Sequence, residues 1–191
     1  MQKNRNIVMV VLGFLFLIAI ATVYTKIMEQ STSIKNVSAL IEHDFTFNSL
    51  DGSEFKVKAS EKKLQIKGME NKVVFLKVFG WDCTFCMKEV PELIKLKNSL
   101  PEAFDVIAIE AQEHSADEAK KFIEEYGINY PIVLGKGQEA FYRYLQQQYG
   151  WTGIIPLTIV ISKKGDILAF ELGSKSYSLS ELFKASLEKS K

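Results

Sequence analysis

Residues 73–86 read VVFLKVFGWDCTFC and form the most informative stretch of this chain. The first seven, 73–79, are an almost continuous apolar run rich in β-branched and aromatic residues, which predicts a strand buried on both faces. A turn follows, and from Thr84 onward the apolar residues recur with the period of a helix. The only two cysteines, Cys83 and Cys86, therefore lie where a buried strand is followed by a helix.

The two cysteines have the spacing Cys-x-x-Cys at the start of the predicted helix. Cys83 falls near the helix N-terminus, where unpaired backbone N–H groups and the helix dipole favour a thiolate. Cys86 follows by three residues, so it lies on the same helical face and within reach of a disulfide. One thiol can attack a substrate disulfide and the other can resolve the mixed disulfide, which predicts dithiol–disulfide exchange.

Other interpretations of this pair stay open. The cysteines could form a static disulfide, although closing so small a loop stabilises a fold little, or they could be inert core thiols. Two thiolates can also hold a soft ion such as Cu(I), with Met87 as a weak extra ligand, as in a copper metallochaperone. Neither histidine, His43 or His114, is near the cysteines in sequence.

The composition is that of a globular protein without an excess of either charge. Of 191 residues, 47% are hydrophobic and 25% charged, and 24 Lys and Arg stand against 23 Asp and Glu. A net charge of +1 offers no electrostatic case for binding nucleic acid. Two cysteines are too few for a disulfide-stapled small fold or a four-thiolate zinc site. Because dithiol–disulfide exchange needs neither a bound metal nor an organic cofactor, we expect none.

The segments around the cysteine stretch predict an α/β fold with a mixed sheet flanked by helices. Upstream, alternating apolar residues on both sides of Asp51-Gly52 predict a β-hairpin. Downstream, strands and helices alternate before a second hairpin that turns at residues 164–166, and a helix closes the chain. The predicted strands are 64–66, 104–109, 130–134, 157–161 and 167–172, and the predicted helices are 84–100, 115–126, 139–149 and 179–187.

The N-terminal segment predicts a membrane anchor. Residues 6–25 carry no charge, and the apolar run 7–24 would span roughly 27 Å as a helix, close to a bilayer core. Lys3 and Arg5 precede this run, so the positive-inside rule leaves the N-terminus in the cytoplasm and exports the rest. A cleaved signal peptide with a small-x-small site at 19–21 is the main alternative, and a buried core helix is another.

These patterns divide the chain into three parts. We expect residues 1–25 to be the anchor or signal peptide, 26–43 a polar tether, and 44–191 one folded domain. The 148 residues of that last part can build a sizeable core. The protein is thus expected to be a single-pass protein of the inner cell membrane, with its domain on the periplasmic, extracytoplasmic side.

The cysteine stretch resembles the active site of membrane-anchored thioredoxin-like proteins of the TlpA/ResA type. The resemblance is carried by FGWDCTFC at 79–86, by KEVP at 88–91, by the preceding hairpin and by Ile155-Pro156, which occur in the family's order. It runs from about residue 45 to the C-terminus. It implies a thioredoxin-like fold and a thiol-disulfide oxidoreductase, and the group is similar to the reductases of cytochrome c maturation.

The resemblance implies roles for individual residues. Cys83 matches the attacking nucleophile and Cys86 the resolving thiol. Glu89 matches a glutamate near the thiols, where a carboxylate could exchange a proton with Cys86. Glu89 would have no role if it were only a solvated helix residue.

Three more residues match substrate-binding positions of the family. Trp81 matches the aromatic beside the disulfide, with ordinary packing as its alternative. Pro156 matches a cis-proline that faces the disulfide, where the bent backbone at Ile155-Pro156 exposes polar groups to a substrate strand. A plain loop proline is the alternative for Pro156.

Lys77 departs from the family pattern. It stands in the middle of the buried strand, where thioredoxins have an acid and the TlpA group usually has Asn. A charged lysine there needs a partner or must lose its proton, and Glu110 at the end of the adjacent strand is one candidate partner. A cationic Lys77 could stabilise a thiolate, whereas a side chain that snorkels outward would not.

Taken together, we expect an extracytoplasmic protein disulfide reductase that uses a Cys-x-x-Cys dithiol. Its partners would be exported proteins with disulfides, with apocytochrome c as the family-level candidate, and a membrane electron donor that re-reduces it. A copper metallochaperone, or a non-catalytic thioredoxin-like module with a structural disulfide, would be the alternatives.

Overall fold

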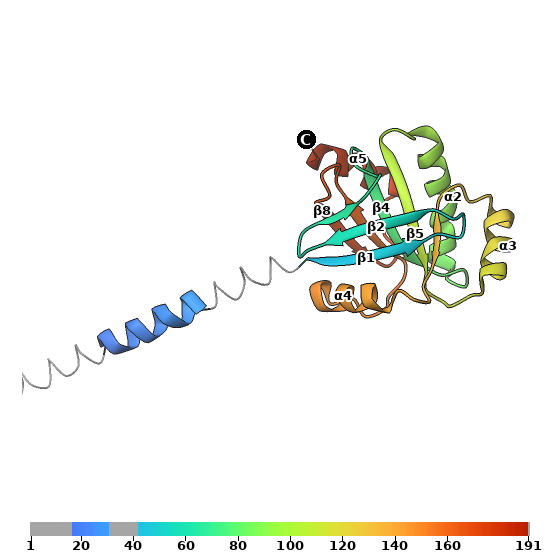
Figure 1. The fold of residues 1–191 in the computed structure, drawn as a ribbon. Helices are drawn as coiled ribbons and strands as arrows, with labels where there is room; N and C mark the ends of the chain where they lie inside the picture. The colour runs from blue at the N-terminus through green and yellow to red at the C-terminus, as the bar shows by residue number, and fades with distance from the viewer. Residues whose placement is uncertain (1–16, 31–41, 191) are drawn as a thin grey trace, which may run out of the picture. The chain divides into compact units, whose positions relative to one another are not determined.

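The computed structural model describes residues 17–30 and 42–190, which belong to two separate units of the chain (Figure 1). Residues 17–30 form a helix. This helix continues five residues past residue 25, where the anchor segment was expected to end. None of the helices in the described part of the chain is long and apolar enough to cross a membrane. The start of the predicted anchor and most of the predicted tether lie outside the described residues.

A five-stranded mixed sheet forms the centre of the second unit, with the strand order β6-β5-β4-β7-β8. Strand β4 (Val73–Phe79) is parallel to β5 (Phe104–Glu110) and antiparallel to β7 (Leu157–Ile161). At the edges, β6 (Ile132–Leu134) is parallel to β5, and β8 (Ile167–Leu172) is antiparallel to β7. Every residue of the three inner strands is buried, and for β4 this two-sided burial was predicted from its apolar run.

Three helices contribute side chains to the buried cluster on one face of this sheet: α2 (Thr84–Ser99), α3 (Ala116–Tyr126) and α5 (Leu179–Lys189). Helix α3 begins with a capping box at Ser115 and ends at Gly127, whose φ of 63° is left-handed. Both ends of α3 were predicted from those two residues. This face of the sheet therefore lies under the helix that carries the cysteines.

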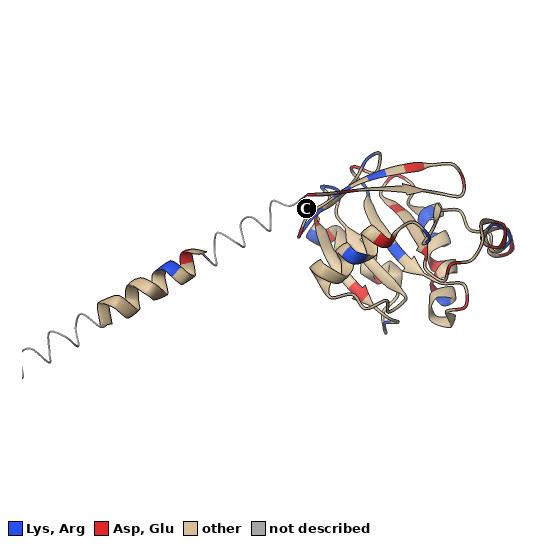
Figure 2. Ribbon diagram, turned by 60° about the horizontal axis from the view of Figure 1, so that its bottom comes forward, with Lys and Arg blue, Asp and Glu red and all other residues tan. Residues whose placement is uncertain are grey.

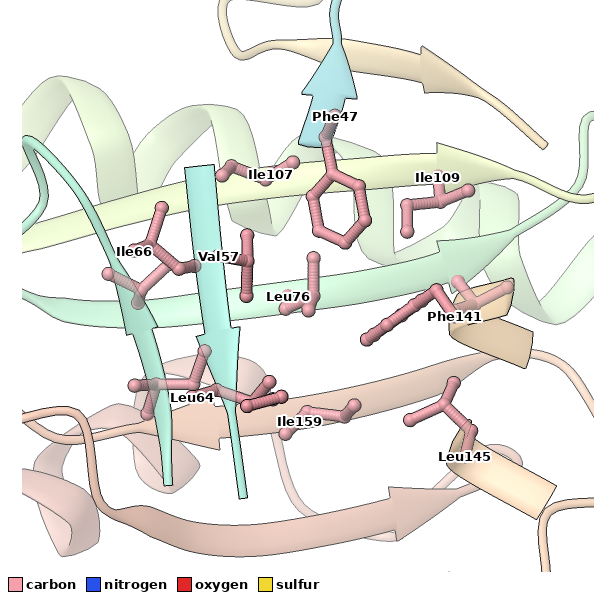
Figure 3. Packing of buried hydrophobic residues seen from close by; sticks show 14 of the residues in the cluster. Phe47, Val57, Leu64, Ile66, Leu76, Ile107, Ile109, Phe141, Leu145 and Ile159 are labelled. Atoms are coloured by element: carbon pink, nitrogen blue, oxygen red, sulfur yellow. The ribbon is translucent and has the colours of Figure 1, made fainter. Parts of the chain in front are cut away.

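The other face is covered by a second sheet and by helix α4 (Glu139–Tyr149). Strands β1 (His43–Asn48), β2 (Glu54–Ala59) and β3 (Leu64–Ile66) form this antiparallel sheet, whose first two strands are the predicted hairpin. Figure 3 shows Phe47 of β1 pointing toward the central strands, beside side chains of α4. The result is a mixed sheet with cover on both faces, as expected for the α/β class.

The predicted and observed elements differ mainly at their ends. The strand expected from residue 130 begins at Ile132, after Pro131, which has no N–H to give to a ladder. Helix α5 extends two residues beyond the predicted end at 187. Acidic and basic residues are interspersed along the ribbon, in keeping with the near-zero net charge (Figure 2).

Candidate active site

Cys83 and Cys86 are joined as a disulfide at the N-terminus of α2, with their Cα atoms 5.2 Å apart. Cys83 is the N-cap of the helix, and its Sγ accepts the backbone N–H of Cys86 at 3.2 Å. Cys83 is half-buried, whereas only 2% of Cys86 is exposed. An external sulfur can therefore approach Cys83 and not Cys86, and the helix end favours negative charge on the Cys83 sulfur.

The loop before the disulfide is anchored by Gln112. The Oε1 atom of Gln112 accepts the backbone N–H of Asp82 at 2.8 Å. The same side chain lies against Gly80 so closely that a Cβ at position 80 would overlap with it. A side chain at position 80 would therefore push Gln112 away and disturb its hydrogen bond to Asp82.

Trp81 is a core residue rather than an exposed contact surface. Its ring stacks on Phe122 with 4.8 Å between centroids and meets the edge of Phe79 at the same distance. The aromatic side chain that is exposed beside the cysteines is Phe85, at 54%. Phe85 could not be identified from the sequence, because nothing in the local pattern tells which of two nearby aromatic rings packs inward.

The Ile155-Pro156 segment lies at the same end of the sheet as the cysteines. Pro156 immediately precedes β7, whose first residue Leu157 pairs with Val78 near the end of β4. The Ile155-Pro156 peptide bond is cis. Ile155 packs against the buried cluster that includes Cys86.

Lys77 is a buried cation directly beneath helix α2. It is 1% exposed, and its Nζ donates to Glu89 Oε2 at 2.7 Å and also to Thr158 Oγ1. Burial lowers the pKa of Lys77, while the charge and hydrogen bond of the Glu89 carboxylate act in the opposite direction. The alternative in which Lys77 snorkels outward is wrong, because its ammonium group is bonded inside the protein.

The expected pairing of Lys77 with Glu110 is also wrong. In the parallel register Lys77 lies beside Ala108, two residues before Glu110. Glu110 is fully buried, and its carboxylate instead accepts hydrogen bonds from the loop that follows β5, including one from the ring of His114. Glu89 takes the place of Glu110 because helix α2 crosses this face of β4 and brings its carboxylate onto Lys77.

A cavity of about 200 Å³ adjoins the Lys77 network. Glu89 and Thr158 line it, together with Phe85, Lys88 and Tyr177. The Glu89 side chain is 18% exposed, compared with 2% for the side chain of Lys77. Solvent can therefore exchange protons with the carboxylate of this pair, while the ammonium group stays shielded.

Two further residues of the site have roles that the sequence does not reveal. Thr158 lies opposite Lys77 in the antiparallel register of β7, a relationship that no local pattern signals. His114 was considered only as a metal ligand, but it lies between Glu110 and Asp82. Across residues 17–30 and 42–190, no three or more His, Cys, Asp or Glu side chains are grouped so that they could hold a metal ion.

Comparison with known sequences supports the resemblance. The model of the AhpC/TSA family matches residues 44–170. Thiol-disulfide oxidoreductase ResA of Halalkalibacterium halodurans is 30% identical over 125 residues, which are 64% of this chain and 66% of that protein. The ResA of Bacillus anthracis is 30% identical over 116 residues, 60% of this chain and 63% of that protein. The chain thus spans slightly less than two thirds of the length of these relatives.

A longer match has lower identity. The ResA of Geobacillus thermodenitrificans is 25% identical over 170 residues, which are 87% of each chain. Among solved structures, StoA from Bacillus subtilis superposes with a TM-score of 0.56 at 17% identity, covering 75% of this chain and 96% of its own. A thioredoxin family protein from Chlorobium tepidum superposes with a TM-score of 0.56 at 21% identity, covering 75% of this chain and 93% of its own. These structures confirm the thioredoxin-like fold.

Proposed function

Because the chain belongs to the AhpC/TSA family, we propose that it is a thiol-disulfide oxidoreductase that reduces disulfides of exported proteins. One observation carries this proposal: the disulfide at the start of α2 pairs an approachable, helix-capping Cys83 with a shielded Cys86. A static disulfide has no need of this asymmetry, whereas an exchange reaction needs one attacking and one resolving sulfur. The names of the ResA relatives point to the same activity.

The reaction has two balanced steps. The Cys83 thiolate attacks one sulfur of the substrate disulfide, which breaks that bond, forms a mixed disulfide and expels the other substrate sulfur as a thiolate. Cys86 then attacks the Cys83 sulfur, closes the Cys83–Cys86 disulfide and releases the second substrate thiolate. Two electrons have passed to the substrate, and the protein is left as the disulfide seen in this structure.

Glu89 is suited to take the proton that Cys86 must lose before it attacks. It lies three residues after Cys86 and hence on the same side of α2. Transfer of the proton from Cys86 to Glu89 moves one negative charge from the carboxylate to the sulfur. The buried net charge does not change, so the step avoids the cost of creating an isolated charge in the core.

The location and partners follow from the N-terminal sequence and the family resemblance. The uncharged run 6–25 behind Lys3 and Arg5 supports a domain on the extracytoplasmic side of the membrane. A reductant there cannot meet cytosolic thioredoxin, so a membrane electron donor must restore the dithiol. The exposed Phe85 beside Cys83 suits an unfolded protein substrate, with apocytochrome c as the candidate within the family.

Trapping of the mixed disulfide tests the function. Cys86→Ser should accumulate a covalent complex with exported proteins that contain disulfides, because the resolving thiol is missing, and Cys83→Ser should accumulate none. A wild-type redox potential close to the roughly −270 mV of thioredoxin supports a reductant, and one near the roughly −120 mV of dedicated oxidases contradicts it. If neither variant traps protein and the disulfide resists reduction until the protein unfolds, the pair is structural.

A further inference from the structure

The His114 ring joins a buried carboxylate to the residue that precedes the attacking cysteine. Its Nδ1 lies 3.0 Å from Glu110 Oε1, and its Nε2 lies 3.6 Å from Asp82 Oδ2. Both ring nitrogens thus face a carboxylate, and only the imidazolium form carries a proton on both of them. The side chain of His114 is 17% exposed and that of Asp82 is 74% exposed, so the bridge is shielded at its Glu110 end and open to solvent at Asp82.

Glu110 provides the fixed end of the bridge. It is fully buried at the end of β5, and its carboxylate accepts the backbone N–H groups of Gln112 at 2.8 Å and His114 at 3.2 Å. These bonds hold the loop that carries His114 in one conformation. A buried carboxylate is costly without a charged partner, and the His114 imidazolium supplies that partner.

The other end of the bridge reaches the cysteine loop at several points. Gln112 holds the backbone of Asp82, and Asp82 is followed directly by Cys83. The His114 ring also meets the edge of Phe122 at 5.6 Å, and Phe122 is the ring on which Trp81 stacks. The loop after β5 therefore supports the segment 80–82 through a hydrogen bond, a charge contact and packed rings.

We propose that His114 is a positioning residue of the dithiol site, whose imidazolium form bridges Glu110 and Asp82 and neutralises the carboxylate beside Cys83. An uncompensated Asp82 would oppose a thiolate on the adjacent residue, because like charges destabilise one another. The inference rests on the proposed function for its biological meaning. It concerns only the ionisation of Cys83 in the reduced protein, however, and can be measured without a substrate.

The charges that face His114 come from three elements: Glu110 from β5, Asp82 from the loop before α2, and Glu118 from the first turn of α3. The hydrogen bond with Glu110 is the largest influence and raises the pKa of His114, while burial opposes it and the charges of Glu110, Asp82 and Glu118 add to it. As pH rises through this pKa, the bridge loses its positive charge. The Asp82 carboxylate is then uncompensated, and Cys83 should ionise less readily than a thiol without a neighbouring carboxylate.

Alkylation of the reduced, full-length protein tests this inference. The rate of iodoacetamide labelling at Cys83 is followed by mass spectrometry as a function of pH in wild type, His114→Gln, Asp82→Asn and the double variant. Near about pH 6, His114→Gln should slow Cys83 labelling roughly two- to fivefold, the range expected from partly screened charge contacts. In the Asp82→Asn background the same substitution should have no effect on the rate.

The second histidine of the chain supplies a matched control. His43 lies on β1 against Phe45 and Tyr144, and His43→Gln should leave Cys83 labelling unchanged. The imidazole titration of His114, followed by NMR, should move to lower pH in Asp82→Asn. Equal slowing by His114→Gln with and without Asp82, or no slowing in wild type, overturns the inference. Either result leaves the trapping experiment, and hence the proposed function, unaffected.

Discussion

Lys77 Nζ donates to Glu89 Oε2 at 2.7 Å, and this ion pair joins the middle of the central strand to the helix that carries both cysteines. The lysine is buried, whereas the carboxylate borders a cavity open to solvent. A pair placed in this way links the protonation of the site to the packing of α2 on the sheet. Substitutions of the pair should therefore change both the free energy of unfolding and the rate of disulfide reduction.

Lys77→Met should destabilise the protein by about 3 kcal/mol, because it leaves the Glu89 carboxylate in a largely buried position without its cation. The double variant Lys77→Met/Glu89→Gln should lose less than the sum of the two single substitutions. Urea unfolding of the four proteins gives the coupling energy. Lys72→Met is the control: Asp105 keeps Lys97 as a partner, so the loss should stay below about 1 kcal/mol. Additive effects of Lys77 and Glu89 would contradict the pairing.

Glu89→Gln should keep the fold and slow reduction of a protein disulfide by up to roughly 10²-fold, the low end for a positioned proton transfer. The pH dependence of Cys86 ionisation should change as well, because its proton acceptor is missing. The control is Glu92→Gln, one turn further along α2, where the carboxylate accepts the N–H of Leu179. If Glu89→Gln matches wild type in rate and in thiol titration, Glu89 acts only as the structural partner of Lys77 and takes no proton from Cys86.

Cys83 should be alkylated before Cys86 in the reduced protein near neutral pH. The Cys83 sulfur is approachable and caps the helix, whereas Cys86 is almost fully covered. Quenched labelling followed by peptide mass spectrometry measures both rates in one sample. Faster labelling of Cys86 would reverse the assignment of attacking and resolving thiol.

The stability contributed by His114 should depend on pH with a defined sign. Its pKa is raised in the folded state, so the contribution is complete below the unfolded histidine pKa of about 6.5 and is lost as pH rises through the higher folded pKa. His114→Gln should therefore cost about 1 kcal/mol more near pH 5.5 than near pH 9, the upper range for a partly screened ion pair. Urea unfolding at the two pH values measures the difference. A loss of stability that is the same at both values would show that the ring is neutral in the fold.

A reporter fused to the C-terminus tests the proposed location. A reporter that is active only outside the cytoplasm should work, because the uncharged run 6–25 follows Lys3 and Arg5. Replacing both basic residues by Glu provides a variant in which this orientation signal is removed. Activity of a cytoplasm-only reporter on the unaltered chain would overturn both the location and the class of substrate.

The elements of the fold were largely predictable because their signals are local. Strands β7 and β8 have the predicted bounds, since a buried apolar run and a turn at residues 164–166 mark their ends. The ends of α3 follow from Ser115 and Gly127, which satisfy the unpaired groups at the helix termini. The Cys-x-x-Cys pair at a strand-to-helix junction pointed to the chemistry for the same reason: its physical consequences depend on neighbours within one helical turn.

The charge partners of the site were not predictable in this way. The sequence showed that Lys77 needs a partner, but it pointed to Glu110, whereas the fold supplies Glu89. Glu110 pairs instead with His114, whose ring also contacts Asp82, the residue before Cys83. Which acid meets which base depends on strand register and on the helix that covers each face of the sheet. Those are long-range packing choices, and only the tertiary structure decides them.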